Sequence, residues 1–454
     1  MNIKNLNHIH FIGIGGVSMS GLALIMKKQG CLISGSDRSH SEITSILEKN
    51  NIKFYYNHDK SHITNPDLVV YTSAIPETNP ELIEARSKNI KCIERSVFLG
   101  YLMKSYTKAL TVTGTHGKTT TTGMVATILE FLDLDSTIMI GGILNNIGGN
   151  VKIGKSDYFL TEACEYKENF LDFFPSHAII LNIDEDHLDY FTGLDHIQKA
   201  FIKYGHKLKN SNNLIINNDD INCNVVKNEF PEAQTFGFSE SSDFRASNLN
   251  YNNLGHPYFK LHIANKIFDV KLNVFGEHNV YNALSAIALC YSLGFPIEQI
   301  LMGIEEFKGT HRRFEKVGVY NNALIIDDYA HHPTAILSTF QSLKSIKHKK
   351  VFAIFQPHTY SRTKALLNDF AKVFDSADTL ILTDIYAARE IDDGSVSIDD
   401  LMIKIEEYSP NINIIHENDF NKISKYIQDN IHENDVCITI GAGNVYEIAN
   451  SIVE

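Results

Sequence analysis

The chain has 454 residues, 43% of them apolar and 21% charged, and its formal net charge is −13. At about 150 residues per domain, this length predicts roughly three domains. The acidic balance argues against a nucleic-acid-binding protein with a broad basic face. No apolar run approaches the roughly 18 residues of a membrane-spanning helix, and no secretory leader is recognisable, so we expect a cytoplasmic protein without a membrane partner. The six cysteines form no C-x-x-C pair, which predicts reduced thiols rather than disulfides or a zinc site.

The first segment of the chain is predicted to fold as a strand, a glycine turn and a helix. Gly13, Gly15 and Gly16 form the turn, and Asp37 ends the next predicted strand. Ser18 stands where the third glycine of G-x-G-x-x-G would be. A turn of this kind holds a diphosphate, and an acid at that position holds a ribose. The pattern therefore favours a nucleotide diphosphate; a dinucleotide and a purely structural turn remain alternatives.

Two further strands are predicted at residues 67–73 and 91–93. The loop after the first strand begins near Ser73 and should lie at the carboxyl edge of the sheet, where α/β proteins bind ligands. A helix and a connector over residues 97–108 lead to a first domain boundary near Ser105.

Residues 108–133 read as a strand, a glycine-bounded loop and a helix, the context of a nucleoside triphosphate site. The predicted phosphate-binding loop consists of Gly114, Thr115, His116, Gly117, Lys118, Thr119 and Thr120. Its glycines let backbone N–H groups face an anion, its lysine meets the outer phosphates, and the threonine after the lysine binds magnesium. Val112 replaces the first glycine of the usual motif, and an ordinary glycine-rich turn is the alternative.

Two later strands are predicted to end on charged groups. One ends at Glu162, and the other is followed by an acidic stretch and His187. Because the carboxyl ends of parallel strands share one edge, Glu162 and His187 can converge on the ion held by Thr119. The alternative for His187 is an exposed histidine beside an acidic loop.

The segments that follow are less regular in pattern. Residues 141–150 are too rich in glycine and asparagine to predict a regular element, and residues 205–275 predict an antiparallel excursion. A clear helix then begins near Asn279 and Asn282, amides that serve either as caps or as readers of a base. A second domain boundary is expected near Phe314.

The last third alternates strands and helices, which predicts another open α/β sheet with polar residues at its carboxyl edge. Pro333 suits the first turn of a helix preceded by His332.

Taken together, the strings GTHGKTTTT, EACEY, NIDEDHLDYF, GEHNVYNA, HRRFE, DDYAHHPT and FQPHTYSRT resemble the Mur ligases over the whole chain. The resemblance implies an α/β fold with three domains: a Rossmann-like N-terminal domain, a phosphate-loop central domain and a Rossmann-like C-terminal domain. The implied ranges are 1–105 for a UDP-sugar, 106–313 for ATP and 314–454 for an amino acid.

The resemblance also implies roles for the central residues. Lys118 would hold the β and γ phosphates of ATP, while Thr119, Glu162 and His187 would surround Mg²⁺. Gly13, Gly15, Gly16, Ser18, Asp37 and Ser73 would serve the UDP-sugar.

For ATP, the resemblance adds Asn279 and Asn282 near the adenine. It brings Arg313 and Asp328 to the same nucleotide from the C-terminal side.

His331 and Arg362 would face the incoming amino acid. Thr359 stands where many relatives carry arginine, which implies one fewer cationic partner for the amino-acid carboxylate. Lys199 and Lys203 follow His187, but neither can be matched to the lysine that some Mur ligases carry as a carbamate.

The implied activity is ATP-dependent ligation of L-alanine to UDP-N-acetylmuramate through an acyl phosphate, in peptidoglycan precursor synthesis, by a monomer or weak homodimer. Three alternatives remain: a ligase that attaches a whole peptide to the same UDP-sugar, an NAD-dependent oxidoreductase, and a nucleotide-binding regulator.

Overall fold

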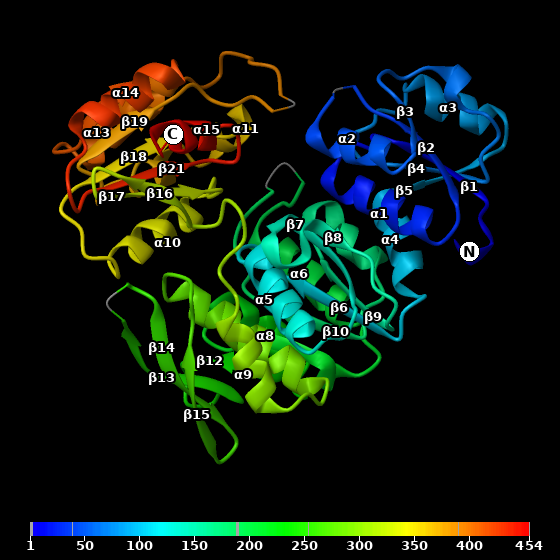
Figure 1. The fold of residues 1–454 in the computed structure, drawn as a ribbon, viewed down its shortest axis with the longest axis horizontal. Helices are drawn as coiled ribbons and strands as arrows, with labels where there is room; N and C mark the ends of the chain where they lie inside the picture. The colour runs from blue at the N-terminus through cyan, green and yellow to red at the C-terminus, as the bar shows by residue number, and fades with distance from the viewer. Residues whose placement is uncertain (1–2, 39, 188–189, 253, 389, 454) are drawn as a thin grey trace. The chain divides into compact units, whose positions relative to one another are not determined.

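The computed structural model describes residues 3–38, 40–187, 190–252, 254–388 and 390–453 (Figure 1). The chain divides into two compact units. The first consists of Met1–Arg245 and Asn282–Glu306, and the second of Ala246–Tyr281 and Phe307–Glu454. All six cysteines are free thiols, as predicted.

The N-terminal part of the first unit is a five-stranded parallel sheet in the order β3-β2-β1-β4-β5. Its strands are β1 (His8–Ile12), β2 (Leu32–Ser36), β3 (Lys53–Tyr55), β4 (Leu68–Tyr71) and β5 (Lys91–Glu94). Its helices are α1 (Val17–Lys28), α2 (Glu42–Lys49), α3 (Pro80–Ser87) and α4 (Arg95–Met103). The predicted strand, glycine turn and helix are confirmed, and Asp37 directly follows β2.

The central part of the first unit contains a mostly parallel sheet in the order β12-β11-β10-β6-β9-β7-β8. Its strands are β6 (Lys108–Thr113), β7 (Thr137–Leu144), β8 (Gly149–Lys152), β9 (Tyr158–Glu162), β10 (His177–Ile180), β11 (Leu214–Asn217) and β12 (Gln234–Gly237). Its helices are α5 (Lys118–Phe131), α6 (Leu194–Gly205), α7 (Asn224–Glu229) and α9 (Ile297–Glu305), together with the part of α8 (His278–Ser292) that starts at Asn282; the first four residues of α8 belong to the second unit. The predicted strand, loop and helix over residues 108–133 are thus β6 and α5.

The prediction that residues 141–150 lack regular structure is wrong. They form the end of β7, a short 3₁₀ turn (Asn145–Ile147) and the start of the antiparallel strand β8. The glycines fit this hairpin because Gly148 and Gly149 occupy the turn at φ of 68° and 155°, values that glycine adopts without strain. The pairing of β7 with β8 changes register between Met139 and Leu144, so the glycine-rich residues fit within the hairpin.

Residues 205–275 contain the predicted antiparallel strands and two strands that the prediction missed. Before the excursion, β11 and β12 extend the parallel sheet of the first unit, and β13 (Phe244–Tyr251) begins beside β12. In the second unit, β14 (Pro257–Ile263) and β15 (Lys266–Lys271) form an antiparallel hairpin.

The C-terminal part of the second unit is a six-stranded sheet in the order β16-β17-β21-β18-β19-β20, with β16 antiparallel and the other strands parallel. Its strands are β16 (Glu315–Tyr320), β17 (Ala323–Asp328), β18 (Val351–Phe355), β19 (Thr379–Leu382), β20 (Asn413–His416) and β21 (Val436–Ile440). Its helices are α10 (Pro333–Leu343), α11 (Tyr360–Ala365), α12 (Leu367–Phe370), α13 (Ile398–Tyr408), α14 (Phe420–Asn430) and α15 (Tyr446–Val453). Pro333 occupies the first turn of α10 after the N-cap His332, as predicted.

Within the first unit, glycine contacts bring the N-terminal and central parts together. A Cβ on Gly100 of α4 would lie 2.0 Å from the carbonyl oxygen of Asp172, and one on Gly21 of α1 would lie 2.7 Å from Val151. The hydroxyl of Ser96 donates to the Asp172 carboxylate at 2.6 Å. The two parts therefore pack closely enough to form sites at their junction.

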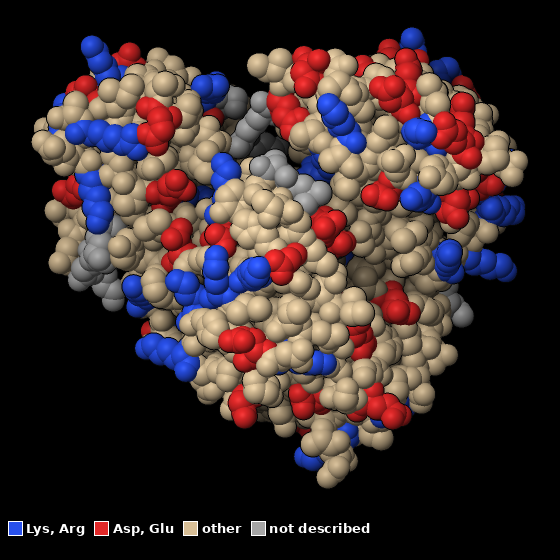
Figure 2. All heavy atoms as spheres, turned by 180° about the vertical axis from the view of Figure 1, so that it is seen from behind, with Lys and Arg blue, Asp and Glu red and all other residues tan. Residues whose placement is uncertain are grey.

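The surface carries both signs of charge. On the face shown in Figure 2, Lys and Arg side chains are interspersed with Asp and Glu. Among the described helices, none combines the length and apolar character needed to cross a bilayer.

Candidate active site

The loop between β6 and α5 depends on two glycines for its shape. Gly117 caps α5 at φ 85°, and Gly114 has φ 133°. A Cβ on Gly114 would lie 2.9 Å from the Leu181 side chain and 3.0 Å from the amide nitrogen of Asn182. Other residues would strain this backbone and collide with the segment after β10. The loop can therefore present N–H groups and the N-terminus of α5 to an anion.

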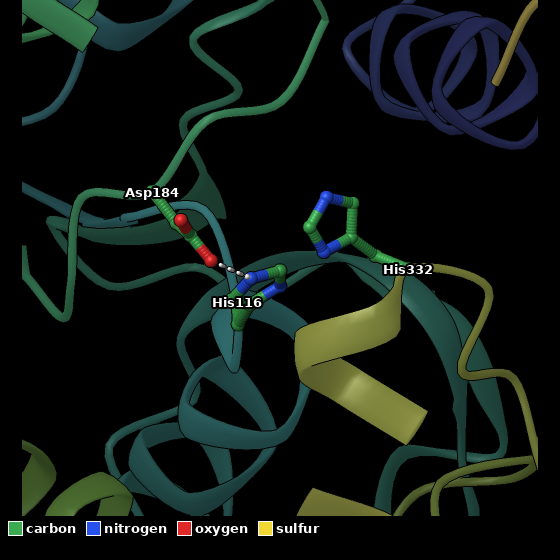
Figure 3. Close-up of side chains that lie close together, drawn as sticks. All are labelled: His116, Asp184 and His332. Carbon is green, nitrogen blue, oxygen red and sulfur yellow. Dashed lines mark hydrogen bonds and ion pairs between the residues drawn. The ribbon is translucent and has the colours of Figure 1, made fainter. Parts of the chain in front are cut away.

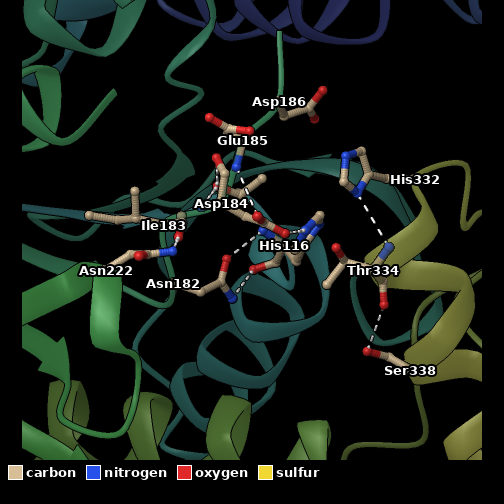
Figure 4. A network of polar contacts seen from close by, with 12 residues as sticks. His116, Asn182, Ile183, Asp184, Glu185, Asp186, Asn222, His332, Thr334 and Ser338 are labelled. Carbon is tan, nitrogen blue, oxygen red and sulfur yellow. Dashed lines mark hydrogen bonds and ion pairs between the residues drawn. The ribbon is translucent and has the colours of Figure 1, made fainter. Parts of the chain in front are cut away.

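The segment after β10 is hydrogen-bonded to this loop (Figure 4). The His116 N–H donates to the Asn182 side-chain oxygen at 2.8 Å, and the Asn182 amide donates back to the His116 carbonyl at 3.1 Å. The Thr115 hydroxyl accepts the Asp184 N–H at 2.9 Å. The His116 ring lies 3.2 Å from the Asp184 carboxylate (Figure 3). The segment after β10 thus holds the loop between β6 and α5 in place through hydrogen bonds.

Lys118 is the first residue of α5, and its ammonium lies in a buried ion pair. Glu165 Oε2 and Oε1 lie 3.0 and 3.3 Å from its Nζ, and the Thr115 carbonyl accepts from it at 3.1 Å. Burial, the largest single effect, lowers the pKa of Lys118, but the Glu165 carboxylate, together with Cys164 and Glu162, raises it overall. The lysine is therefore held charged beside the loop.

Thr119 and Glu162, two predicted magnesium ligands, lie together. The Thr119 hydroxyl donates to Glu162 Oε2 at 3.1 Å, and the Gly141 N–H donates to Oε1 at 2.6 Å. A hydroxyl and a carboxylate are the hard oxygen donors that Mg²⁺ prefers. This pair therefore fits the ion.

His187, the third predicted ligand, lies against Tyr166 with ring centroids 4.6 Å apart. Its Nε2 is 3.8 Å from the Asp186 carboxylate, and its φ is 56°. Tyr166 follows Glu165 in the chain, so His187 contacts the segment that begins at Glu162. Its role as a magnesium ligand stays a prediction. Leu188 and Asp189 of the same motif lie outside the described residues.

Asn279 and Asn282 lie one turn apart in α8. Asn282 is close to the phosphate loop, because a Cβ on Gly117 would lie 2.7 Å from its side-chain oxygen. Asn279 donates to the Phe275 carbonyl at 2.7 Å and is buried. Asn282 is thus placed near the nucleotide loop, while adenine recognition by the pair stays a prediction.

In the glycine turn after β1, Asp37 bonds to the backbone of the turn, and its predicted role toward a ribose stays a prediction. The Asp37 carboxylate accepts the Gly15 N–H at 2.9 Å, so this acid stabilises the turn itself. Ser18 accepts a hydrogen bond from the Arg95 guanidinium at 3.0 Å. Ser73 is exposed after β4.

In the second unit, the two consecutive arginines differ in their surroundings. Arg312 donates to Asp327 at 3.1 Å and to the carbonyls of Gly443 and Gly441 at 2.9 and 2.7 Å. The Arg313 guanidinium lies over the Tyr329 ring at 4.7 Å. Arg312 therefore fixes the start of this sheet, and the role of Arg313 at ATP stays a prediction.

Asp328 ends β17 and is almost fully buried. Burial raises the pKa of its carboxyl to about 6, although the hydroxyl of Thr339 donates to it and Arg313 is near. This carboxyl can change its charge near neutral pH.

The predicted amino-acid site is a cluster of rings and one guanidinium. His331 lies 5.8 Å from His358 between ring centroids, and Arg362 Nη1 is 3.3 Å from His358 Nδ1. Burial and the Arg362 charge lower the pKa of His358 to about 4. Thr359, at the position of the missing arginine, has φ 68°, an unusual conformation for a β-branched residue.

Lys199 and Lys203, the two lysines considered for a carbamate, are in exposed ion pairs. Lys199 lies 2.5 Å from Asp195, and Lys203 lies 2.8 Å from Glu168. Their side chains are 65% and 57% exposed, which does not favour a metal-bridging carbamate at either.

Sequence reasoning missed four residues that the structure brings to these sites. They are Arg95, Glu165, Asn182 and Arg312. A polar residue directly after a buried strand was a usable signal for Asn182, and the second acid of EACEY was one for Glu165. Arg312 lies beside Arg313 in the string HRRFE, whereas Arg95 carries no distinguishing local pattern.

Comparison with known families accounts for most of the chain. Residues 8–107 match the family described as "Mur ligase family, catalytic domain", residues 112–290 the "Mur ligase middle domain", and residues 312–443 the "Mur ligase, glutamate ligase domain". A UDP-N-acetylmuramate–L-alanine ligase from Caldanaerobacter subterraneus is 44% identical over 100% of this chain and 99% of its own length. The chain belongs to the Mur ligase family. A second such ligase, from Alkaliphilus metalliredigens, is 46% identical over 100% of this Mur ligase and 98% of its own length.

Solved Mur ligase structures agree with the fold. The UDP-N-acetylmuramate-alanine ligase of Thermotoga maritima aligns over 99% of this chain and 98% of its own, with a TM-score of 0.82 and 30% identity. A murein peptide ligase from Psychrobacter arcticus aligns over 98% of each chain with a TM-score of 0.72 and 24% identity, which shows the shared fold alone. The predicted three-domain α/β Mur ligase fold is therefore confirmed.

Proposed function

We propose that this chain is an ADP-forming ligase that joins L-alanine to UDP-N-acetylmuramate, a step in the synthesis of peptidoglycan precursors. The observation that carries the proposal is the phosphate loop, where a buried, charged Lys118 stands beside the Thr119–Glu162 oxygen pair. The full-length relatives at 44% and 46% identity, both named for this reaction, support the choice of substrates.

The reaction needs an activated carboxylate, because joining a carboxylate to an amine in water is unfavourable. The lactyl carboxylate oxygen of the sugar attacks the γ-phosphorus of ATP, the bond to the β-phosphate oxygen breaks, and ADP leaves. The amine of L-alanine then attacks the acyl carbon of the resulting acyl phosphate. The tetrahedral intermediate expels phosphate and loses a proton, which leaves the amide.

The chain's own residues provide charge and position. Lys118 offsets the repulsion between the two anions of the first step and orients the outer phosphates. Mg²⁺, held by Thr119 and Glu162 with His187 as a further candidate, would supply additional positive charge at the phosphates. Fixing the reactants in position can lower the barrier by about 7 to 11 kcal/mol, more than one acid–base residue supplies.

The residues of the second unit keep the roles that the family resemblance implies. Arg313 and Asp328 act on ATP, and His331 and Arg362 act on the amino acid. The functional ranges proposed are 1–105 for the UDP-sugar, 106–313 for ATP and 314–454 for L-alanine. The substrates are those of a cytoplasmic enzyme, and we expect a monomer or weak homodimer.

The test measures phosphate release with UDP-N-acetylmuramate, ATP and Mg²⁺ against L-alanine, L-serine, glycine and the peptide used by peptide ligases. Release that requires the sugar nucleotide and is strongest with L-alanine supports the proposal. Release strongest with the peptide would favour the peptide-attaching ligase. Phosphate release that no amino acid or peptide stimulates would reject ligase chemistry.

A further inference from the structure

A cavity of about 170 Å³ lies within the first unit, where its N-terminal and central parts meet. It is lined by Ser18 in the first turn of α1 and by Arg95, the first residue of α4. The central part contributes Asn150, Glu162 and Cys164. The cavity therefore reaches from the glycine turn of the N-terminal sheet to the carboxylate beside the phosphate loop.

Arg95 is the only cation on this cavity wall, and its guanidinium has no carboxylate partner among the described residues. Its hydrogen bond is to the neutral Ser18 hydroxyl at 3.0 Å. Burial lowers the pKa of Arg95, with weaker opposite effects from Cys164 and Glu94.

Two other cations of the described residues that are largely shielded from water, Lys118 and Arg312, are paired with acids. Lys118 lies 3.0 Å from Glu165, and Arg312 lies 3.1 Å from Asp327. A buried cation without an anion is costly, because its lost hydration is not repaid. The unpaired guanidinium on a cavity wall therefore indicates that a ligand supplies the negative charge.

The helix beside Arg95 adds to the positive potential. α1 spans twelve residues, its N-cap is Gly16, and neither a capping side chain nor an acidic residue in its first turn offsets its N-terminus. Its N-terminal end therefore carries a partial positive charge. Ser18 lies in that first turn and holds the guanidinium at its side.

We infer that Arg95, together with the N-terminus of α1, binds an oxyanion group of the sugar nucleotide in this cavity. The inference rests on the proposed function and extends it by naming the cation that the substrate meets. Two groups of UDP-N-acetylmuramate have the required chemistry, the diphosphate and the lactyl carboxylate. Both are negatively charged oxygen acceptors that a guanidinium can contact through two N–H groups.

The test is calorimetric binding to the full-length protein and its Arg95→Met and Arg95→Lys variants. Arg86→Met is the matched control, because Arg86 lies in the same sheet domain but pairs with Glu77 at the surface. The titrants are UDP-N-acetylmuramate, UDP-N-acetylglucosamine, which lacks the lactyl carboxylate, and UDP. ATP is titrated to report an intact central domain.

We expect Arg95→Met to weaken UDP-N-acetylmuramate binding at least tenfold, Arg95→Lys to weaken it less, and Arg86→Met to change it less than twofold. ATP binding should stay within twofold in all variants. If binding of UDP-N-acetylglucosamine is unaffected, the contact is to the lactyl carboxylate. If binding of all three uridine nucleotides falls in parallel, the contact is to the diphosphate.

A second readout separates binding from structure. Because the guanidinium is unpaired in the free protein, Arg95→Met should leave the midpoint of thermal unfolding unchanged or raise it. Unchanged sugar-nucleotide binding, or a lowered midpoint together with weakened ATP binding, would overturn the inference. A wild-type protein that binds none of the sugar nucleotides would reject the proposed function itself.

Discussion

Glu165 Oε2 lies 3.0 Å from Lys118 Nζ, and the two side chains are 3% and 16% exposed. The cation that the proposed mechanism brings to ATP thus has a fixed partner within the protein. A change at Lys118 consequently has two effects, one on phosphate binding and one on the Glu165 carboxylate that it leaves unpaired.

These two effects can be separated with paired variants. Lys118→Met should abolish turnover and lower the free energy of unfolding by about 3 to 5 kcal/mol, because a buried charge loses its partner. Lys118→Met/Glu165→Gln should recover most of the stability and none of the turnover. Lys199→Met, in an exposed pair, should change stability by less than about 1 kcal/mol. Denaturant unfolding and phosphate release measure the two quantities; a double variant as unstable as the single one would contradict the ion-pair account.

Glu81 should be equally important for the stability of the N-terminal sheet. Its fully buried carboxylate accepts hydrogen bonds from His10, His58, His62 and Ser36. Burial would raise its pKa, but the bonds from His10, His58 and Ser36 outweigh burial and lower it to about 2. Glu81→Gln should lower the free energy of unfolding by about 3 kcal/mol. Glu84→Gln, in a partly exposed ion pair of α3, should cost less than about 1 kcal/mol.

The pH dependence has a defined sign for Glu81. Its folded pKa lies below the unfolded value of 4.5, so its stabilising contribution is present above pH 4.5 and is lost as the pH falls toward 2. Wild-type protein and Glu81→Gln should therefore converge in stability at low pH. A constant difference between pH 7 and pH 3 would contradict this assignment.

The two arginines before β16 should separate stability from turnover. Arg312→Ala removes bonds to Asp327 and two carbonyls, so it should lower the unfolding midpoint of the second unit. Arg313→Ala should leave that midpoint and sugar-nucleotide binding unchanged while reducing turnover at least a hundredfold. Calorimetry and phosphate release test this, and normal turnover in Arg313→Ala would remove Arg313 from the mechanism.

Asp328 should make the second unit less stable as the pH rises. Its folded pKa of about 6 exceeds the unfolded value of 3.8, so its contribution is fully present below pH 3.8 and is lost as the pH rises through 6. The loss amounts to about 3 kcal/mol at most. Asp328→Asn should remove this dependence, so the stability difference between wild type and variant, followed from pH 4 to 7.5, should change over this window. A difference that stays constant would show that the carboxyl is not perturbed.

Local pattern was sufficient to predict the elements whose shape depends on nearby residues. Gly114, Gly117 and Lys118 indicated the loop and α5, and Pro333 indicated the start of α10. The hairpin of β7 and β8 could not be predicted this way, because β7 is stabilised by pairing with β9, and β8 by pairing with β7, rather than by their own glycine-rich composition.

Local sequence pattern predicted only some of the charged contacts of the site. Thr119 and Glu162 could be paired in advance because parallel strands share an edge. The role of Arg95 could not be predicted, since it depends on the guanidinium having no carboxylate partner among the described residues, which follows from how α4 packs against the central part. The role of Asp37 in stabilising the turn likewise depends on a backbone N–H that sequence does not locate.

The reciprocal bonds between His116 and Asn182 have a consequence for protein engineering and for divergence within the family. Transplanting residues 114–119 alone into another scaffold would carry over the motif without the support that gives it shape. Residues 181–184 therefore form part of the inherited module, and substitutions on either side should be tolerated only in combination with changes on the other.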